Sequence, residues 1–363
     1  MSHNLISNPL FNSSLPAPFH ELKQFLPQKS AYSRAELESI RVAFGTKTFN
    51  PNDYPQITVA KSGVPYVRQL DIEDGEDCSM LKVFAIDYSD CPLDVKLRID
   101  QLKSHVQGIY AFDKPQSGFM RVKDLMSGNR DGPGTAFTTS LTLYNSWCVA
   151  PVAHSVEKED ADNRVPKWVK TFHILLGNLA QSAMPKFMSQ EYIQFCNTRK
   201  TIVNSPCFGS SYDTQSYFSS AQVNCSNGEI HVGGKAGDVH TDTQDCKASY
   251  SMSVNLSVVR SSSNLGYFWF PNLDLIIPVK PQQIIIFQGI EEHTGTPLII
   301  DKTDKSVLPL GYPNDVRFNI IAYPKAGIIN GTSPRNLNST ISDASKANLY
   351  QHALPHFSGK LNY

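Results

Sequence analysis

Two histidines and one aspartate in the second half of the chain could together bind a metal ion. His240 and Asp242 are two residues apart in the segment His240-Thr241-Asp242. On an extended segment, residues i and i+2 point to the same side, so both side chains can reach one ion. His293 follows His240 by 53 residues, and we expect it on another strand. Two imidazoles and a carboxylate on one face of an octahedron suit Fe(II) and leave three positions for substrate chemistry.

A candidate anion-binding residue follows His293 by 24 residues, in the run VRFNIIAY at 316–323. Alternation along a strand places Arg317, Asn319, Ile321 and Tyr323 on one face. A planar guanidinium can bind a carboxylate through two parallel hydrogen bonds. We therefore interpret Arg317 as a residue that could hold a carboxylate at the base of a barrel.

The elements that must position these residues lie between 201 and 325, where helical spacing of apolar residues disappears. The run from Tyr250 to Val258 alternates strictly, which predicts a half-buried strand. Many short strands with turns between them indicate a sandwich or double-sheet barrel. The extended runs are expected at 250–258, 266–270, 273–279, 284–288 and 316–323.

The first 200 residues have a more helical pattern. Ser33 and Glu36 form an S-x-x-E capping box that begins a helix at 34–43. Further helices are predicted at 92–110 and 168–184, the second ended by Pro185, with a helix-like stretch at 19–25 and a short helix at 189–194. Strands are predicted at 56–59, 81–88 and 135–147. We expect a mainly helical buttress with a few strands at 1–200, the barrel core at 201–325 and a polar tail at 326–363.

The order of these motifs resembles that of the Fe(II)/2-oxoglutarate-dependent dioxygenases, and fungal members related to the nucleobase-oxidising TET/JBP branch in particular. The resemblance lies in the asparagine-ended run 221–224 (AQVN), the His240-Thr241-Asp242 turn, the hairpin at 266–273 and the distal His293. It covers about 201–325. It implies an α+β protein whose core is a double-stranded β-helix, or jelly roll, buttressed by the N-terminal helices.

The resemblance also implies roles for individual residues. His240, Asp242 and His293 would bind Fe(II), and Arg317 would bind the distal carboxylate of 2-oxoglutarate. Asn319 and Asn224 would support this cosubstrate, and O2 would be the oxidant. Because the interval between His293 and Arg317 is longer than the family pattern, Arg260 and Lys325 remain alternative carboxylate anchors.

Composition limits the partners. The chain of 363 residues has 33 basic and 33 acidic side chains, a balance that does not favour a general nucleic-acid binder. It contains no apolar run long enough to cross a membrane and no signal-peptide pattern. Its seven scattered cysteines form no C-x-x-C pair and are typical of reduced thiols. We expect a cytoplasmic enzyme with a small-molecule substrate and no membrane partner; the oligomeric state is left open.

The leading hypothesis is a dioxygenase that couples oxidative decarboxylation of 2-oxoglutarate to oxidation of a substrate C–H bond, by hydroxylation, desaturation or ring closure. An amino acid or a secondary metabolite is the favoured substrate. The alternatives are a nucleobase or protein-side-chain oxidase, an iron enzyme that does not use 2-oxoglutarate, and a non-catalytic jelly-roll binding module. A zinc site that includes His231 is a further alternative, although no cysteine accompanies it at zinc spacing.

Overall fold

The computed structural model describes residues 24–26, 32–44, 50–71, 77–110, 134–140, 143–144, 148–149, 167–187, 218, 220–227, 239–242, 245, 250–296, 298–308 and 315–323.

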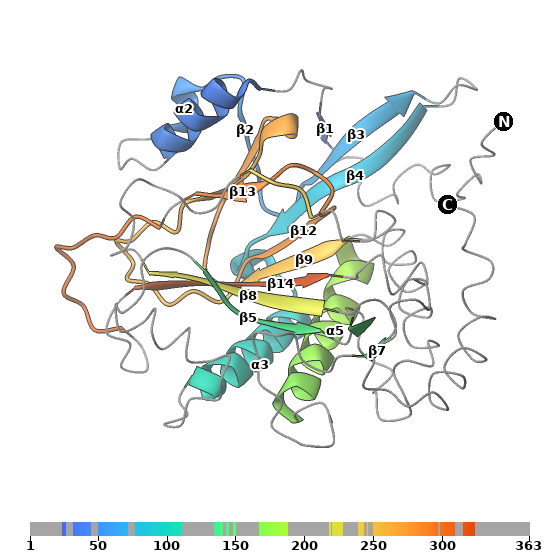
Figure 1. Ribbon diagram of the computed structural model, residues 1–363, viewed down its shortest axis with the longest axis vertical. Helices are drawn as coiled ribbons and strands as arrows, with labels where there is room; N and C mark the ends of the chain where they lie inside the picture. The colour runs from blue at the N-terminus through green and yellow to red at the C-terminus, as the bar shows by residue number, and fades with distance from the viewer. Residues whose placement is uncertain are drawn as a thin grey trace.

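Two sheets form the centre of the molecule (Figure 1). The larger, sheet A, has the strand order β1-β3-β4-β12-β9-β14-β8-β5, and the smaller, sheet B, has the order β13-β10-β11-β2. Most pairs are antiparallel, whereas β1 with β3 and β11 with β2 are parallel. A separate pair consists of β6 and β7. The strands are β1 (Gln24–Leu26), β2 (Thr58–Val59), β3 (Pro65–Asp71), β4 (Asp77–Ile86), β5 (Gly134–Ser140), β6 (Leu143–Tyr144), β7 (Cys148–Val149), β8 (Ser220–Asn227), β9 (Ser251–Asn255), β10 (Tyr267–Phe270), β11 (Leu275–Pro278), β12 (Ile284–Phe287), β13 (Thr294–Gly295) and β14 (Val316–Tyr323).

The path of the chain from β8 to β14 is that of a jelly roll. β8 lies in sheet A, and the chain then passes His240, which pairs with His293 beside sheet B. The next strands lie in sheets A, B, B, A, B and A in turn, from β9 to β14. Because the chain alternates between two facing sheets, residues far apart in sequence become neighbours inside the roll. The predicted double-stranded β-helix is confirmed.

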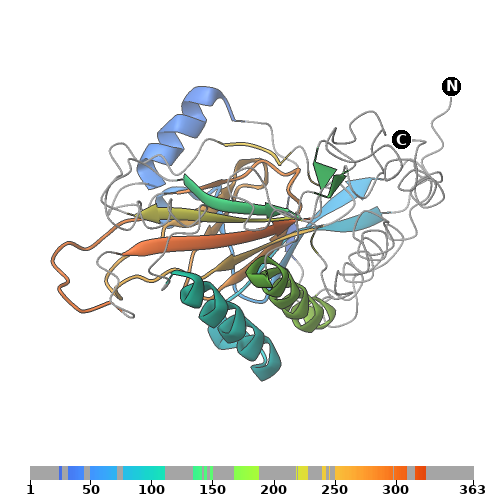
Figure 2. The ribbon, with the colours of Figure 1, turned by 60° about the horizontal axis from the view of Figure 1, so that its bottom comes forward.

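Helices cover both outer faces of this roll. Figures 1 and 2 show α3 (Leu93–Tyr110) and α5 (Lys167–Phe187) on the outer side of sheet A, and α2 (Arg34–Phe44) on the opposite side of the molecule. Helices α3 and α5 share one core with the outward side chains of β9, β12 and β14, among them Phe318 and Ile320. Helix α2 packs its Ile40 against Trp269 and Ile276 of sheet B. Three short 3-10 helices complete the elements: η1 (Pro51–Asp53), η2 (Tyr88–Asp90) and η6 (Pro271–Leu273).

Strand β9 shows how this layering changes the expected environment of a strand. Its apolar residues Met252 and Val254 share one buried face as predicted, and this face meets the helices. Its opposite face was predicted to meet water, and this is wrong, because every residue of β9 is buried. The serine and asparagine side chains of this face lie inside the roll, where sheet B covers them. A strand can therefore alternate in polarity and still be buried on both sides when polar groups line the interior.

Three other predictions of local structure need correction. Helix α5 continues through Pro185 to Phe187, since a proline near the last turn removes only one hydrogen bond. Residues Gln24–Leu26 form a strand paired with β3 rather than part of a helix, because sheet pairing overrides weak local helical spacing. Within the run at 135–147, β5 and β6 are separate strands that belong to different sheets. The helix expected at 189–194 and the tail at 326–363 lie outside the described residues.

The first 200 residues also enter the sheets directly. Strands β1, β3, β4 and β5 lengthen sheet A on both sides of the jelly-roll strands, and β2 extends sheet B. The boundaries proposed for the N-terminal buttress therefore stay a prediction. Among the described residues, no helix is both long and apolar enough to cross a membrane.

Candidate metal centre

The two histidines meet through a backbone bridge at the open edge of β13. The N–H of His240 donates to the carbonyl of His293 at 3.1 Å, and the N–H of His293 donates to the carbonyl of His240 at 2.9 Å. This antiparallel pairing leaves the centroids of the two imidazole rings 4.6 Å apart. The jelly-roll connection thus brings together two residues that are 53 positions apart in sequence.

Asp242 completes the group from the same turn as His240. Its N–H donates to the carbonyl of Gly289 at 2.7 Å, which fixes the backbone at this point. One carboxylate oxygen lies 3.7 Å from Nε2 of His240, and the other lies 3.5 Å from Nε2 of His293. Across the three residues, one candidate ligand atom from each lies within 4.8 Å of the others. The donor set is the one that suits Fe(II), and the atoms are close enough to share one ion.

The surroundings of His293 hold its ring in place and leave Nε2 as the nitrogen that could bind a metal. The ring lies among Phe268, Phe270 and Phe287, with centroid separations of 5.4, 6.1 and 5.0 Å, and its side chain is 2 % exposed. Nδ1 is 2.7 Å from the carbonyl oxygen of Glu291. Because a carbonyl oxygen can only accept, Nδ1 carries a hydrogen, and Nε2 is the ring nitrogen left to bind a metal, the arrangement usual for metal-binding histidines.

His240 and Asp242 form the open side of the centre. The His240 side chain is 53 % exposed and that of Asp242 is 31 % exposed, so an ion held by the three residues would be reached from this side. The exposed fraction of the side chain therefore increases from His293, inside the roll, to His240, at its edge. This is the geometry in which a small molecule could approach a metal without passing through the aromatic core.

A glycine holds the two ligand-bearing segments close together. A Cβ atom built on Gly289 would collide with the Asp245 carboxylate and would lie 3.0 Å from Cβ of Asp242. Asp245 is itself fixed, because its N–H donates to the carbonyl of Asp242 at 3.0 Å and its carboxylate accepts from Oγ of Ser251 at 2.6 Å. Only a glycine at 289 therefore allows the turn after β12 to touch the turn that carries Asp242.

Arg317 lies on the interior face of β14, against the strand that carries His293. One Nη atom donates to the carbonyls of Leu265, at 3.1 Å, and Thr296. A Cβ built on Gly295 would lie 3.5 Å from its other Nη atom, and Gly295 faces the same side of β13 as His293. Thr296 follows His293 by three residues, which is about 10 Å on an extended segment. The guanidinium of Arg317 thus lies about three residues further along this segment than His293.

The charge of Arg317 has no acidic partner among the described residues. Its two hydrogen bonds go to neutral carbonyls, and burial lowers the pKa of its guanidinium to about 10, still well above neutral pH. A desolvated cation is costly unless it is paired, so a site of this kind favours an anionic ligand. The residue fits the carboxylate-binding role expected for it.

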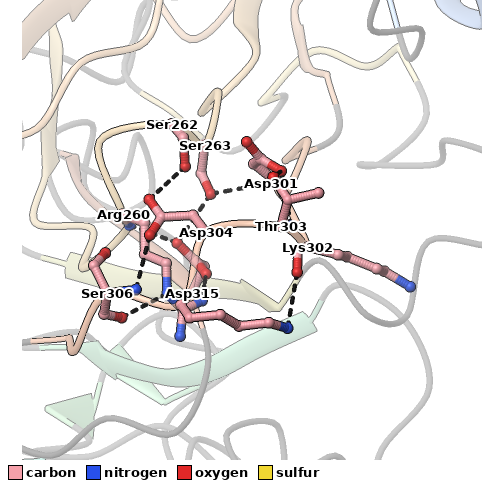
Figure 3. A network of polar contacts seen from close by, with 10 residues as sticks. Arg260, Ser262, Ser263, Asp301, Lys302, Thr303, Asp304, Ser306 and Asp315 are labelled. Atoms are coloured by element: carbon pink, nitrogen blue, oxygen red, sulfur yellow. Dashed lines mark hydrogen bonds and ion pairs between the residues drawn. The ribbon is translucent and has the colours of Figure 1, made fainter.

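The alternative anchor Arg260 is already neutralised. Figure 3 shows its guanidinium on the carboxylate of Asp315, which is fully buried. The backbone N–H of Arg260 donates to the same carboxylate at 2.5 Å, Oγ of Ser263 donates to it at 3.0 Å, and Nε of Arg260 donates to the carbonyl of Ser306 at 2.9 Å. Arg260 therefore holds the loop at 298–308 to the rest of the roll. The other alternative, Lys325, lies outside the described residues, as does His231 of the zinc hypothesis.

Three asparagines form a row across β8, β14 and β9. Asn319 is in register with Asn224 on one side and with Asn255 on the other. Oδ1 of Asn319 accepts a hydrogen bond from Oγ of Ser253 at 2.6 Å. The amide nitrogen of Asn255 is buried without a partner in the described structure, although its oxygen accepts from the N–H of Ser257. The side chain of Asn224 lies outside the described residues, so its role stays a prediction.

Sequence reasoning missed Lys82 and Glu291. The Lys82 ammonium lies 2.7 Å from the Glu291 carboxylate, and both residues are buried. Burial lowers the pKa of Lys82, the ion pair and hydrogen bond with Glu291 oppose this, and the nearby charge of Arg68 lowers it further. The available signal was a single lysine inside the apolar run MLKVFAI at 80–86, a position that is costly unless the charge is paired.

Comparisons with known proteins give structural matches only. No protein-family model and no curated protein sequence matches the chain. NgTET1 in complex with 5mC DNA is 11 % identical, with a TM-score of 0.41, and the match covers 87 % of this chain and 97 % of that chain. A rice dioxygenase for auxin oxidation is 14 % identical (TM-score 0.30, covering 68 % and 74 %), and OsALKBH1 is 12 % identical (TM-score 0.32, covering 67 % and 96 %). At these values we infer function only from the contacts within this chain.

Proposed function

We propose that this chain is an Fe(II)- and 2-oxoglutarate-dependent dioxygenase that oxidises a C–H bond of a small molecule. The observation that carries the proposal is the grouping of His240, Asp242 and His293 within 4.8 Å, at the edge of a jelly roll whose inward face holds Arg317, a cation that no described acidic residue neutralises. Two imidazoles and one carboxylate form the ligand set of non-haem Fe(II) oxygenases.

Each of the proposed ligands has a distinct task. His293 would hold the ion from the dry side, because the Glu291 carbonyl fixes its ring and three phenylalanines exclude water from it. Asp242 and His240 would hold it from the open side, where their exposed fractions are larger. With two oxygens facing two imidazoles, the Asp242 carboxylate also offsets the charge of the cation.

Arg317 would bind the carboxylate of the cosubstrate that is remote from the metal. Its guanidinium contacts Thr296, three residues after His293, so a dicarboxylate that extends from the metal along this segment would meet it. When bound, Fe(II) and 2-oxoglutarate would supply the oxidation of the C–H bond by O2, with succinate and CO2 as coproducts. The neighbouring Asn319, Ser253 and Asn255 would line the same interior face.

A small molecule is the substrate class that we favour over a nucleobase or a protein side chain. The chain has no surplus of basic side chains, with 33 against 33, whereas proteins that bind nucleic acids usually need a cationic surface. A cytoplasmic location fits the scattered cysteines, of which Cys91 is a buried free thiol. An amino acid or a secondary metabolite remains the favoured kind of substrate.

The decisive experiment is anaerobic addition of Fe(II), then of 2-oxoglutarate, with the visible spectrum recorded at each step. We expect the weak charge-transfer band of a 2-oxo acid chelated to iron. Asp242→Ala should bind no iron, and Arg317→Ala should bind iron but need much more 2-oxoglutarate to produce the band. The matched arginine control, Arg260→Ala, should need no more 2-oxoglutarate than the wild type to produce the band.

The possible results separate the alternatives. Iron binding without the band would favour an iron enzyme that does not use 2-oxoglutarate. No iron binding would favour a non-catalytic binding module. Once the band is established, succinate release can be screened with amino acids, other small carboxylic acids and a 5-methylcytosine oligonucleotide; a response to the oligonucleotide alone would overturn the small-molecule proposal.

A further inference from the structure

Lys82 is an extra residue in the β3–β4 ladder. Tyr66 pairs with Val83 and the next residue, Val67, pairs with Leu81, so Lys82 has no partner across the ladder. An extra residue of this kind forms a β-bulge, which locally twists a strand and redirects a side chain. Bulges of this type often lie beside functional sites.

The Lys82 side chain reaches the segment between β12 and β13, far away in sequence. Its Nζ atom lies 2.7 Å from a carboxylate oxygen of Glu291 and donates to Oε1 of Gln288 at 3.2 Å. Lys82 is 4 % exposed and Glu291 is 8 % exposed, so this is a buried ion pair. The turn also has a backbone hydrogen bond of its own, because the N–H of Glu291 donates to the carbonyl of Gln288 at 3.0 Å.

The turn that Lys82 contacts supports two of the three candidate metal ligands. The carbonyl of Glu291 accepts from Nδ1 of His293 at 2.7 Å, and the carbonyl of Gly289 accepts from the N–H of Asp242 at 2.7 Å. These two carbonyls determine the ring orientation of His293 and the backbone position of Asp242. A change in the position of this turn would therefore change the positions of both His293 and Asp242.

We propose that Lys82 is a positioning residue of the metal centre, which acts through Glu291 and Gln288 to hold the turn that orients His293 and Asp242. This inference rests on the proposed function, since it assumes that these residues bind a metal. Lys82 has no direct contact with either ligand. Its effect on the metal is indirect, and its contribution is the fixed geometry of the turn.

The expected effect follows from what its removal would leave behind. Without the ammonium, the Glu291 carboxylate would be buried next to an uncharged side chain, and it would move toward water. The Glu291 carbonyl would move with it and would loosen the hydrogen bond to His293. Loss of groups that orient metal ligands typically weakens metal binding by about 10–100-fold.

The test compares Lys82→Met with Lys280→Met in the full chain. Lys280 forms an ion pair with Asp87 at the turn before β12, so the control removes the same side chain and one ion pair away from the ligands. Mn(II) affinity is measured by calorimetry, and the unfolding temperature is measured without metal. We expect Lys82→Met to weaken Mn(II) binding about 10–100-fold and Lys280→Met to leave it unchanged.

Two further measurements separate positioning from general stability. The visible spectrum of bound Co(II) reports ligand geometry and should change in Lys82→Met but not in Lys280→Met. The double variant Lys82→Met/Glu291→Gln has no unpaired buried carboxylate at 291. Part of the Mn(II) affinity lost in Lys82→Met should therefore return. If Lys82→Met does not fold, Glu291→Gln alone, which keeps the carbonyl that contacts His293, should still weaken binding several-fold.

The contrary results are distinct. A folded Lys82→Met that binds Mn(II) with wild-type affinity and gives the wild-type Co(II) spectrum would overturn the inference while leaving the proposed function intact. Unchanged affinity in Glu291→Gln would do the same. A wild-type protein that binds no metal would overturn the proposed function, and this inference with it.

Discussion

Two arginines of the jelly-roll region, Arg260 and Arg317, have opposite surroundings. Arg260 donates to the buried carboxylate of Asp315 and to a backbone carbonyl, within the polar network that joins two loops (Figure 3). Arg317, two residues after Asp315, donates within the described part of the chain to the carbonyls of Leu265 and Thr296 and to no acidic group. Both arginines are partly exposed, yet only one has its charge neutralised by the described residues.

This difference separates polar groups that build the fold from polar groups that can bind a ligand. In the Arg260 network every acidic group has a hydrogen-bond donor: Asp304 accepts from Ser262, Asp301 accepts from Thr303, and Asp315 accepts from Arg260 and Ser263. Inside the roll, the charge of Arg317 is paired with no acidic group among the described residues, although its guanidinium donates to two carbonyls, and the amide nitrogen of Asn255 has no acceptor in the described structure. Saturated groups stabilise, whereas unsaturated buried groups favour a ligand that completes them.

The largest effect is expected at the metal centre itself. Asp242→Ala removes the only carboxylate of the proposed ligand set, so Mn(II) affinity should fall by well over about 100-fold, more than for a residue that only orients ligands. The side chain is 31 % exposed and lies in a turn, so the unfolding temperature without metal should change little. Calorimetry and thermal denaturation of the same samples check both. Retained metal binding would remove Asp242 from the site.

The Arg260 network should show the reverse behaviour. Asp315→Ala leaves the Arg260 guanidinium without its counter-ion, and we expect a loss of about 3 kcal/mol in the free energy of unfolding. Mn(II) binding by the folded variant should be unchanged. Urea denaturation measures the first quantity and calorimetry the second. A variant that is fully stable but binds metal poorly would reverse the assignment of the two regions.

Arg317→Ala should affect the cosubstrate rather than the metal. Loss of a charge-assisted contact with a carboxylate costs about 1.5–3 kcal/mol, which corresponds to a rise of about 10–100-fold in the apparent Kd for 2-oxoglutarate. Mn(II) affinity should stay near that of the wild type. The measurement is a titration of the metal-loaded variant with 2-oxoglutarate, with Arg260→Ala as control. A weaker affinity for 2-oxoglutarate in Arg260→Ala and an unchanged one in Arg317→Ala would assign the carboxylate-binding role to Arg260 instead.

The smallest effect is expected at the exposed edge of the network. Hydrogen bonds from Ser262 and Ser306 lower the pKa of Asp304 from 3.8 to about 2. Because the folded-state pKa is lowered, the stabilisation is present above about pH 4 and is lost as the pH falls toward 2. Asp304→Asn should therefore be slightly less stable than the wild type at pH 7, with the difference shrinking below pH 4. Urea midpoints across this range test it; a difference that grows on acidification would contradict it.

Much of the jelly roll could be predicted from sequence patterns, because strands of four to eight residues carry their own signals. The run 316–323 was predicted with the bounds that β14 has, and 284–288 differs from β12 by one residue. The apolar face of β9 was also predicted to be buried, and it is. The pairing of β1 with β3 was not predictable, because a segment of three residues carries no periodicity that distinguishes a strand from a helix.

In the candidate site, too, the local features could be predicted from the sequence and the long-range contacts could not. The H-x-D spacing and the later histidine are local features, and they were sufficient to nominate three ligands. The choice between Arg317 and Arg260 was not local, because it depends on Asp315, which is 55 residues from Arg260. Lys82 and Glu291 are separated by more than 200 residues, and nothing in the sequence near either one names its partner.

The sequence by itself therefore determined the chemistry that is available: two imidazoles, a carboxylate, a guanidinium and the strands that carry them. The tertiary structure alone decided which charges neutralise one another and which are left for a ligand. The physical reason is that side-chain type and strand periodicity are properties of neighbouring residues. Neutralisation and burial depend on groups that come together only when the two sheets close on each other.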